Sequence, residues 1–452
     1  MLNLMILACL LPSNSLQLPQ QPAPVVVTLP KYPVAALQAA VDLSTYQQRT
    51  SAVRELVKRS IPLNQWVAAS KALRLRKSKS ERFDDQTVRY KVPIEVAGYL
   101  QDVEILVRTQ PESPIGPQPA LLCWHAADGD GASSLRMWAT LADRYGLILV
   151  APTISSEAYR EDGWTSHRQG YELVQGALRF VRRHYNVDED RIMLAGTRAG
   201  GDLVWDVGIR VSDQFAALLP ANGSPRLGNP YGKSNMAYLE SITAVSVLSM
   251  RWGRADAEIT TVDRSIEVLR QFGAQHVDHF GFASQLNALN PNLPGWDRLF
   301  SSRRTAPDVL VKFPDCAGEP HRRDFGRHHW LEVLDYQRKA KVPFPPKVPD
   351  RRWRKLDDAG RLTYLDQYLR DALPRLEVRR SGPGQFTVKD REIASFRLLL
   401  SKNMLGEQAK VAVRWRGRTI RRPVVFSPEV FLREFVERFD RTFLPVAEVI
   451  LK

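Results

Sequence analysis

Short apolar runs alternate with amphipathic stretches through the middle of the chain. The runs occupy residues 119–125, 147–152, 192–195, 215–220 and 244–250. Between two of them, residues 171–185 carry apolar side chains at helical spacing. Continuous apolar runs of this length are typical of parallel strands covered on both faces, and the intervening helices supply that cover. The pattern therefore predicts an α/β fold with a mostly parallel central sheet flanked by helices.

The regions on either side of this pattern differ from it. Residues 90–96 and 103–107 alternate apolar and polar positions, which predicts two antiparallel strands that begin the sheet. Apolar residues at helical spacing in residues 31–79, among them Val34, Leu37 and Val41, predict an N-terminal helical segment.

The last part of the chain is predicted to be rich in β-structure. Strands are expected at residues 385–388, 396–400, 411–415, 424–426 and 446–451. Arg416 and Gly417 make a plausible hairpin turn, and Ser427 followed by Pro428 begins a helix with an apolar stripe that ends at Phe439.

These patterns divide the chain into five segments, which we expect to form a helical segment, an α/β domain and a small β-rich C-terminal domain. The segments are a signal-like stretch with a Pro/Gln linker at 1–30, the helical segment at 31–85, the α/β domain at 86–282, a connecting segment at 283–328 and the β-rich domain at 329–452.

Residues 191–201 read RIMLAGTRAGG, which has the frame of a strand that turns sharply into a helix around a central residue. In the motif G-x-S-x-G the turn is so tight that its neighbours must be small, and the central residue is a nucleophile. Gly196 and Gly200 provide the small positions. The central residue is Arg198, whose guanidinium stays protonated and cannot attack a carbonyl carbon.

Residues 163–223 closely resemble secreted esterases and depolymerases of the α/β-hydrolase superfamily, which are similar to prolyl-oligopeptidase-like proteins. The shared pattern is a helix, "VDxDRIxLxGxSxGG", a second helix and "FAAxxPxxG", which here reads VDEDRIMLAGTRAGG and FAALLPANG. This match covers about a seventh of the chain. It implies an α/β-hydrolase fold and a site built from a nucleophile, an acid, a histidine and an oxyanion loop.

The resemblance assigns positions to the rest of that site. The oxyanion loop would follow strand 119–125 and offer backbone N–H groups at Ala126 and, after the nucleophile position, at Ala199. His125 is expected to pack beside that loop. Asp256 stands at the position of the acid.

The catalytic histidine of the family should follow the strand expected at residues 276–280, but Phe282 is the nearest occupant of that place. His279 lies near the end of this strand and is a weak candidate. Three further histidines, His321, His328 and His329, come much later in the chain.

Three hypotheses about function follow. The leading one is a catalytically degenerate hydrolase with a binding role, in which Arg198 pairs with Asp256 across the vacated site. The second is an active esterase or peptidase that uses Thr197 or Ser166 together with a distal histidine. The third is a basic scaffold that binds envelope polymers, and it depends on charge alone.

The chain has 452 residues and a net charge of +15, an excess that permits binding to anionic polymers without requiring it. Basic residues gather locally at 351–355 and 414–418, where arginines alternate with tryptophan. Alternating arginines on a strand usually form its solvated face, so the sequence does not favour nucleic acid as the partner. A polysaccharide or a peptide is the candidate ligand, and the oligomeric state is open.

Three cysteines give neither metal-binding spacing nor a disulfide framework, so no metal and no cofactor is expected. Residues 1–11 are apolar like the core of a signal peptide, and Cys9 is placed as in a lipoprotein signal. With the Pro/Gln-rich stretch that follows, this favours export to the periplasm, envelope or exterior, with a cytoplasmic location as the alternative. No later stretch is long enough to span a membrane.

Overall fold

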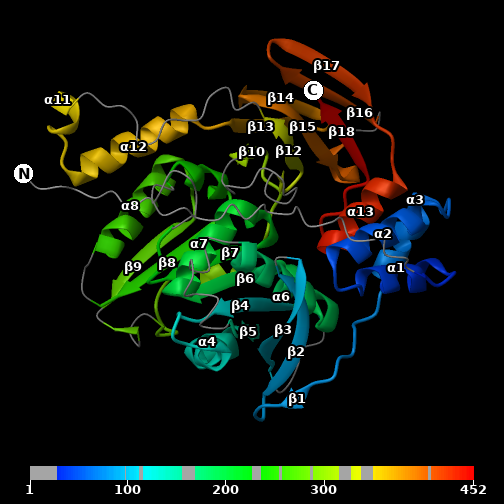
Figure 1. Ribbon diagram of the computed structural model, residues 1–452, viewed down its shortest axis with the longest axis horizontal. Helices are drawn as coiled ribbons and strands as arrows, with labels where there is room; N and C mark the ends of the chain where they lie inside the picture. Colours follow the sequence, from blue (N-terminus) through cyan, green and yellow to red (C-terminus); the bar gives the residue numbers. More distant parts are fainter. Residues whose placement is uncertain are drawn as a thin grey trace, which may run out of the picture.

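The structure is a computed structural model, shown in Figure 1. It describes residues 28–96, 98–110, 116–154, 168–225, 236–253, 257–282, 284–285, 289–314, 327–336, 350–405 and 409–452. The predicted signal-like stretch up to residue 27, together with Ser166, Asp256 and His321, lies outside the described residues.

The central element is a mixed sheet to which the described residues contribute nine strands, in the order β1-β2-β3-β5-β4-β6-β7-β8-β9. Strands β1 to β3 are antiparallel, β3 pairs antiparallel with β5, and all strands from β5 to β9 run parallel. The strands are β1 (Glu81–Arg82), β2 (Thr87–Val96), β3 (Tyr99–Arg108), β4 (Gln118–Trp124), β5 (Ile148–Pro152), β6 (Val187–Thr197), β7 (Ala217–Ala221), β8 (Ser246–Trp252) and β9 (Val277–Phe282). The predicted mostly parallel sheet and its antiparallel first hairpin are confirmed.

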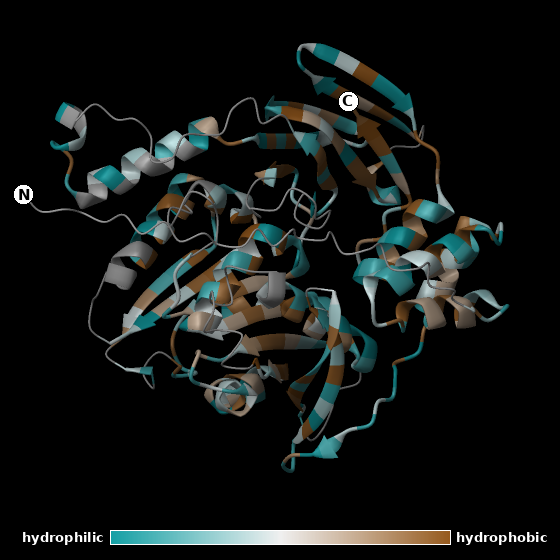
Figure 2. Cartoon of the chain, viewed as in Figure 1, coloured by the Kyte–Doolittle hydropathy of each residue, from teal (hydrophilic) through white to brown (hydrophobic). Residues whose placement is uncertain are grey.

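Helices cover both faces of this sheet, as the continuous apolar runs require. One core packs the sheet against α6 (Arg168–His184), α7 (Ala199–Val211) and α8 (Ala257–Gln271), and the other packs it against α4 (Gly131–Tyr145) and α10 (Trp296–Ser301). Every residue of β4, β5 and β7 is buried. Figure 2 shows hydrophobic residues concentrated along these central strands.

The N-terminal segment forms α1 (Pro33–Val41), α2 (Tyr46–Val57) and α3 (Leu63–Lys71), which confirms the predicted helices. Thr45 and Gln48 cap α2 reciprocally, each side chain accepting a hydrogen bond from the other residue's backbone N–H. The apolar faces of these helices pack on α13 (Pro428–Arg438), more than 350 residues further along the chain. The apolar stripe of α13, with Phe431 and Phe435, thus completes the core of the N-terminal segment.

Two additional β-sheets form the C-terminal part, around a shared core. Their strands are β10 (Val309–Lys312), β13 (Arg375–Gly382), β14 (Gln385–Arg391), β16 (Lys410–Trp415) and β17 (Arg418–Pro423) in one sheet, and β11 (Arg327–His328), β12 (Leu331–Tyr336), β15 (Ile393–Leu400) and β18 (Ala447–Leu451) in the other. Helices α11 (Asp350–Trp353) and α12 (Asp358–Ala372) precede β13, and short 3₁₀ turns lie at Ser212–Gln214, Met236–Ile242 and Lys402–Met404. β10 and β11 come from the expected connecting segment, so it contributes to both sheets.

The strand expected at residues 424–426 is wrong: the strand of this region is β17, which ends at Pro423. Arg416 and Gly417 form the tight turn with positive φ angles of 49° and 75°. A two-residue turn of this type fixes the pairing register, so Arg418 must lie opposite Trp415. The polar residues directly after the turn therefore enter the sheet, and Val425 is left 76% exposed.

Candidate functional site

Arg198 is the single residue between the end of β6 and the start of α7. Its backbone has φ 53° and ψ −114°, outside the usual regions for a residue with a side chain. The Arg198 N–H donates to the Ala221 carbonyl at 2.8 Å, and the Arg198 carbonyl accepts from the Asp202 N–H at 2.8 Å. Holding such a conformation costs on the order of 1–3 kcal/mol, which the surrounding strands and helix must offset.

Gly196 and Gly200 are required by the close approach of the chain at this turn. A Cβ on Gly196 would lie 2.1 Å from the Gly200 carbonyl oxygen, and one on Gly200 would lie 2.4 Å from the Trp124 carbonyl oxygen. Both contacts are to backbone, which cannot rotate away. The turn thus has the strained, glycine-flanked geometry that the sequence predicts for a nucleophile elbow.

Among the residues that the structure describes, no base lies against a hydroxyl group at the elbow. Arg198 is exposed. Thr197 is 8% exposed, and its hydroxyl donates to the sulfur of Met137 at 3.0 Å. A threonine nucleophile requires a base held against its hydroxyl, whereas the atom held here is a thioether sulfur, a weak acceptor.

His125 links the segments that follow β4 and β5, beside the elbow. Its Nδ1 lies 2.6 Å from the Ala126 carbonyl oxygen, to which it donates, because Nε2 accepts from the Ile154 N–H at 2.9 Å. The ring is 1% exposed, and burial lowers its pKa. Both ring nitrogens are therefore occupied by backbone, as expected for a histidine that packs beside the loop.

The two residues assigned to the oxyanion loop lie where the elbow crosses the end of β4. Ala199 is the first residue of α7, whose early N–H groups have no acceptor within the helix. The neighbouring Gly200 abuts the carbonyls of Trp124 and His125, directly before Ala126. The chain crossing thus brings Ala126 and Ala199 to the same end of the sheet.

His279 contacts an aspartate of α8 and not a residue of the elbow. Its Nε2 lies 2.6 Å from an oxygen of Asp263 on α8, and the same oxygen is 3.4 Å from Arg251 Nε. Two strands separate β9 from β6, so three strand spacings, about 14 Å, lie between His279 and the elbow. The structure does not bring His279 to Thr197 or Arg198, and Phe282 is the last residue of β9.

His328 and His329 lie at the opposite end of α7 from the elbow. His328 Nε2 is 3.0 Å from the Ser212 hydroxyl, and His329 Nε2 is 3.0 Å from the Thr305 carbonyl. The 13 residues of α7 separate them from Arg198 by about 20 Å. Burial lowers the pKa of each to about 4, so both are neutral at pH 7.

Other candidate groups are used structurally. The Trp415 indole is buried and donates to Asp390, and Arg416 pairs with the same carboxylate, so the 414–418 group is not an open stacking surface. Cys123 is buried, which raises the pKa of its thiol.

Within the described ranges there is no cluster of three or more His, Cys, Asp or Glu residues suited to a metal ion. No helix in that part of the chain has the length and apolarity needed to cross a membrane.

The strand order, the parallel core and the glycine-flanked turn between β6 and α7 are the features of an α/β-hydrolase-like fold. No protein-family model matches the sequence. A curated relative is a poly(3-hydroxybutyrate) depolymerase from Ralstonia pickettii, 27% identical over 134 residues, which are 26% of this chain. The match spans about 28% of that protein's length.

Several solved esterase structures are also similar to the chain. They include a thermostable esterase, with 15% identity, a TM-score of 0.37, and coverage of 49% of this chain and 64% of that one. An S-formylglutathione hydrolase from Staphylococcus aureus has 14% identity and a TM-score of 0.38, over 50% of this chain and all of that one. A ferulic acid esterase has 17% identity and a TM-score of 0.38, over 48% of this chain and all of its own.

Proposed function

We propose that this protein is a catalytically degenerate α/β-hydrolase that has kept the scaffold of an esterase and serves a binding role. The observation that carries the proposal is Arg198 at the central position of the elbow. Its neighbours keep the glycines that the strained turn demands, while its own side chain is a permanently charged guanidinium.

The histidine positions support the same proposal. His125 is occupied by backbone groups, His279 by Asp263, and His328 lies at the far end of α7. Without a nucleophile and a base the acyl-transfer mechanism is removed rather than weakened, because the two act as a unit. A pairing of Arg198 with Asp256 stays part of this proposal.

The proposed ligand class is supported by a similarity to one relative. The similarity to a poly(3-hydroxybutyrate) depolymerase supports binding of a polymer at the elbow end of the sheet. We propose a polysaccharide or a peptide as that ligand. The rival is an active esterase or peptidase in which Thr197 replaces the usual nucleophile, and the contact of its hydroxyl with Met137 speaks against it.

One experiment separates these two. The purified chain, Arg198→Ser and Thr197→Val are assayed with p-nitrophenyl acetate and p-nitrophenyl butyrate and are treated with a fluorophosphonate probe. We expect no turnover and no labelling of the wild-type chain, because it lacks a nucleophile.

Turnover or labelling of the wild-type chain would refute the proposal that the protein is catalytically degenerate. If that activity were lost in Thr197→Val, the alternative of an active enzyme with Thr197 as nucleophile would be established. Activity that appears in Arg198→Ser alone would show that an oxyanion loop and a base survive around the substituted position. Circular dichroism of all three proteins serves as the folding control.

A further inference from the structure

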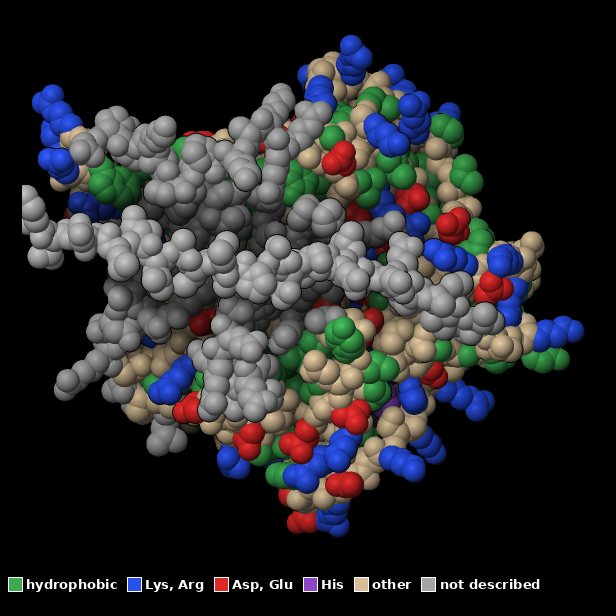
Figure 3. Space-filling model, viewed as in Figure 1, with side chains coloured by type: hydrophobic (Ala, Val, Ile, Leu, Met, Phe, Trp, Pro, Cys, Tyr) green, Lys and Arg blue, Asp and Glu red, His purple; other side chains and the backbone are tan. Residues whose placement is uncertain are grey.

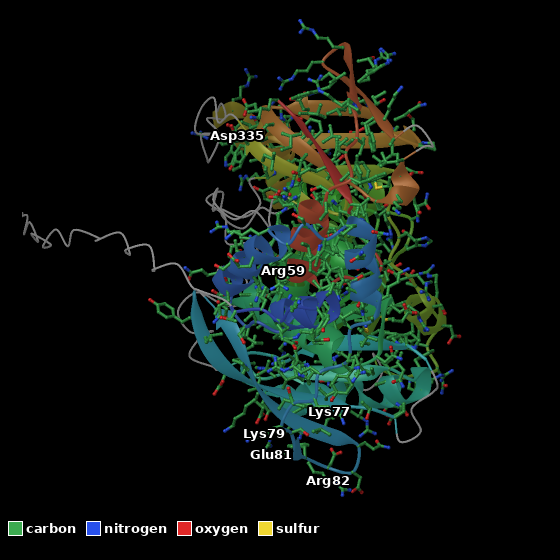
Figure 4. All side chains as sticks on the ribbon, turned by 90° about the vertical axis from the view of Figure 1, so that its right-hand side faces the viewer. Arg59, Lys77, Lys79, Glu81, Arg82 and Asp335 are labelled. Atoms are coloured by element: carbon green, nitrogen blue, oxygen red, sulfur yellow. The ribbon has the colours of Figure 1, made fainter. Side chains whose placement is uncertain are left out.

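The hairpin of β16 and β17 forms one edge of the five-stranded C-terminal sheet, because β17 is the last strand in the order of that sheet. Every residue of β17 except Ile420 is exposed. Figure 4 shows the side chains of this hairpin projecting from one end of the molecule, opposite the end at which Glu81 and Arg82 form β1. The hairpin is therefore placed to meet a partner before the rest of the chain does.

Strand pairing lines up basic residues along this hairpin. Lys410 and Arg414 of β16 lie two residues to either side of Ala412, which pairs with Arg421 of β17. The three cations therefore share the outer face of the sheet, with Arg421 about 7–8 Å from each of the other two. All three side chains are exposed, so their charges face solvent.

The charges of the hairpin are largely unbalanced. Arg416 in the turn binds Asp390 at 2.7 Å, and Glu377, the acidic residue that strand pairing places on the outer face of the described strands, is bound by Arg375. Within the part of the chain that the structure describes, five cations of the hairpin have no carboxylate partner: Lys410, Arg414, Arg418, Arg421 and Arg422. Figure 3 shows Lys and Arg side chains gathered over β16 and β17. Cations this close repel one another, and an anionic partner relieves that repulsion.

Two large apolar side chains directly follow the basic strand. Val425 is 76% exposed and Phe426 is 42% exposed. Val424 precedes them, is buried in the C-terminal core and donates from its N–H to the Ala409 carbonyl at 2.8 Å. Since Val424 is directed inward, Val425 is directed outward beside it, next to the end of β17. Unpaired cations and exposed apolar side chains therefore lie side by side on this edge.

The apolar pair distinguishes among the anionic partners that the charges would suit. Single-stranded nucleic acid needs aromatic rings on which bases stack, but the Trp415 indole is buried and donates to Asp390. A soluble acidic polysaccharide matches the cations but offers no apolar phase to Val425 and Phe426. An anionic bilayer matches both, because its headgroups attract the cations and its acyl chains accept the apolar side chains.

We propose that β17 and residues 425–426 dock this protein on the surface of an anionic lipid bilayer. The guanidinium groups of Arg418, Arg421 and Arg422 donate hydrogen bonds to headgroup phosphates. Val425 and Phe426 enter the boundary between headgroups and acyl chains. This surface belongs to a different sheet from the elbow, so the inference goes beyond the binding role proposed there and does not depend on it.

The expected strength of docking follows from the groups that take part. Each basic residue close to an anionic bilayer strengthens partitioning by about fivefold, which corresponds to about 1 kcal/mol. Loss of two arginines should therefore weaken partitioning by about 25-fold. Loss of the two apolar side chains should weaken it by about tenfold or more, because their transfer out of water is lost.

The test is sedimentation of the purified full chain with vesicles of phosphatidylcholine alone and of phosphatidylcholine mixed with phosphatidylglycerol. We expect binding to the mixed vesicles that weakens as salt is added, because salt screens exposed charges. Arg421→Gln/Arg422→Gln should show the 25-fold loss, and Val425→Ser/Phe426→Ser the tenfold loss. All four residues are exposed, so the variants should keep the fold, and circular dichroism checks this.

Lys77→Gln/Lys79→Gln is the matched control, because the net charge of +15 by itself attracts the chain to anions. It removes two charges from exposed residues at the opposite end of the molecule (Figure 4) and should leave binding unchanged. An equal loss in this control would overturn the proposal, and so would equal binding to phosphatidylcholine alone or unchanged binding by either hairpin variant. Binding to soluble polygalacturonate in place of the mixed vesicles would also overturn it, with an acidic polysaccharide as the partner.

Discussion

The close crossing at the elbow predicts that two glycines of the same helix, Gly200 and Gly208, differ in how far replacement by alanine destabilises the protein. In Gly200→Ala the new methyl group would lie 2.4 Å from the Trp124 carbonyl oxygen and 2.7 Å from the His125 carbonyl oxygen. Both are backbone atoms, so α7 or the end of β4 must move. In Gly208→Ala the methyl would meet a terminal methyl of Leu218 at 2.4 Å, which a rotamer change can relieve.

The magnitudes follow from these contacts. Overpacking against backbone costs up to about 3 kcal/mol, and alanine returns about 1 kcal/mol of helix propensity, so Gly200→Ala should lower the free energy of unfolding by about 2 kcal/mol. For Gly208→Ala, a rotamer strain of about 1 kcal/mol offsets a similar propensity gain, and the net change should be close to zero.

The assay is equilibrium denaturation in guanidinium chloride, followed by the fluorescence of the buried tryptophans Trp124, Trp138 and Trp205 and by circular dichroism. Equal midpoints for wild type and Gly200→Ala would refute the reasoning, because the elbow would then tolerate a side chain at its crossing point. Equal losses in both variants would refute the distinction between backbone and side-chain contacts.

Two further predictions concern buried charge. Arg304 binds Asp440 and Asp190 between the central sheet and the C-terminal part, and its side chain is 4% exposed. Arg304→Met should lower the free energy of unfolding by about 3–5 kcal/mol, because it leaves a buried carboxylate without its partner. An unchanged midpoint of thermal unfolding, monitored by circular dichroism, would contradict this expectation. The pKa of His328 is lowered from 6.5 to about 4 by burial, so the unfolded chain binds more protons between these values and stability should fall as pH decreases from 6.5 to 4. His328→Gln should flatten that dependence, and an unaltered pH profile of denaturation midpoints for this variant would count against it.

The positions of the central elements could be predicted because their signals are local. Fully apolar runs mark strands covered on both faces, and the spacing of Gly196 and Gly200 marks a tight turn whatever residue stands between them. The same frame places Arg198 at the central position of the turn, and the loss of a nucleophile there stays a prediction. The strand predicted at residues 424–426 is wrong because the turn at Arg416 and Gly417 fixes the register, which places residues 418–423 in the sheet whatever their polarity.

What only the tertiary structure decided is which distant groups meet. The sequence by itself determined the α/β sheet and the glycine-flanked turn in which Arg198 stands. It could not show that His279 lies against Asp263, that α13 closes the N-terminal core, or that Arg49 binds Glu437, 388 residues away. Such pairs depend on how helices and strands pack, because no local period relates their positions. The same packing leaves a cavity of about 420 Å³ between α2, β2, α6 and α13, which no pattern of residues along the chain reveals.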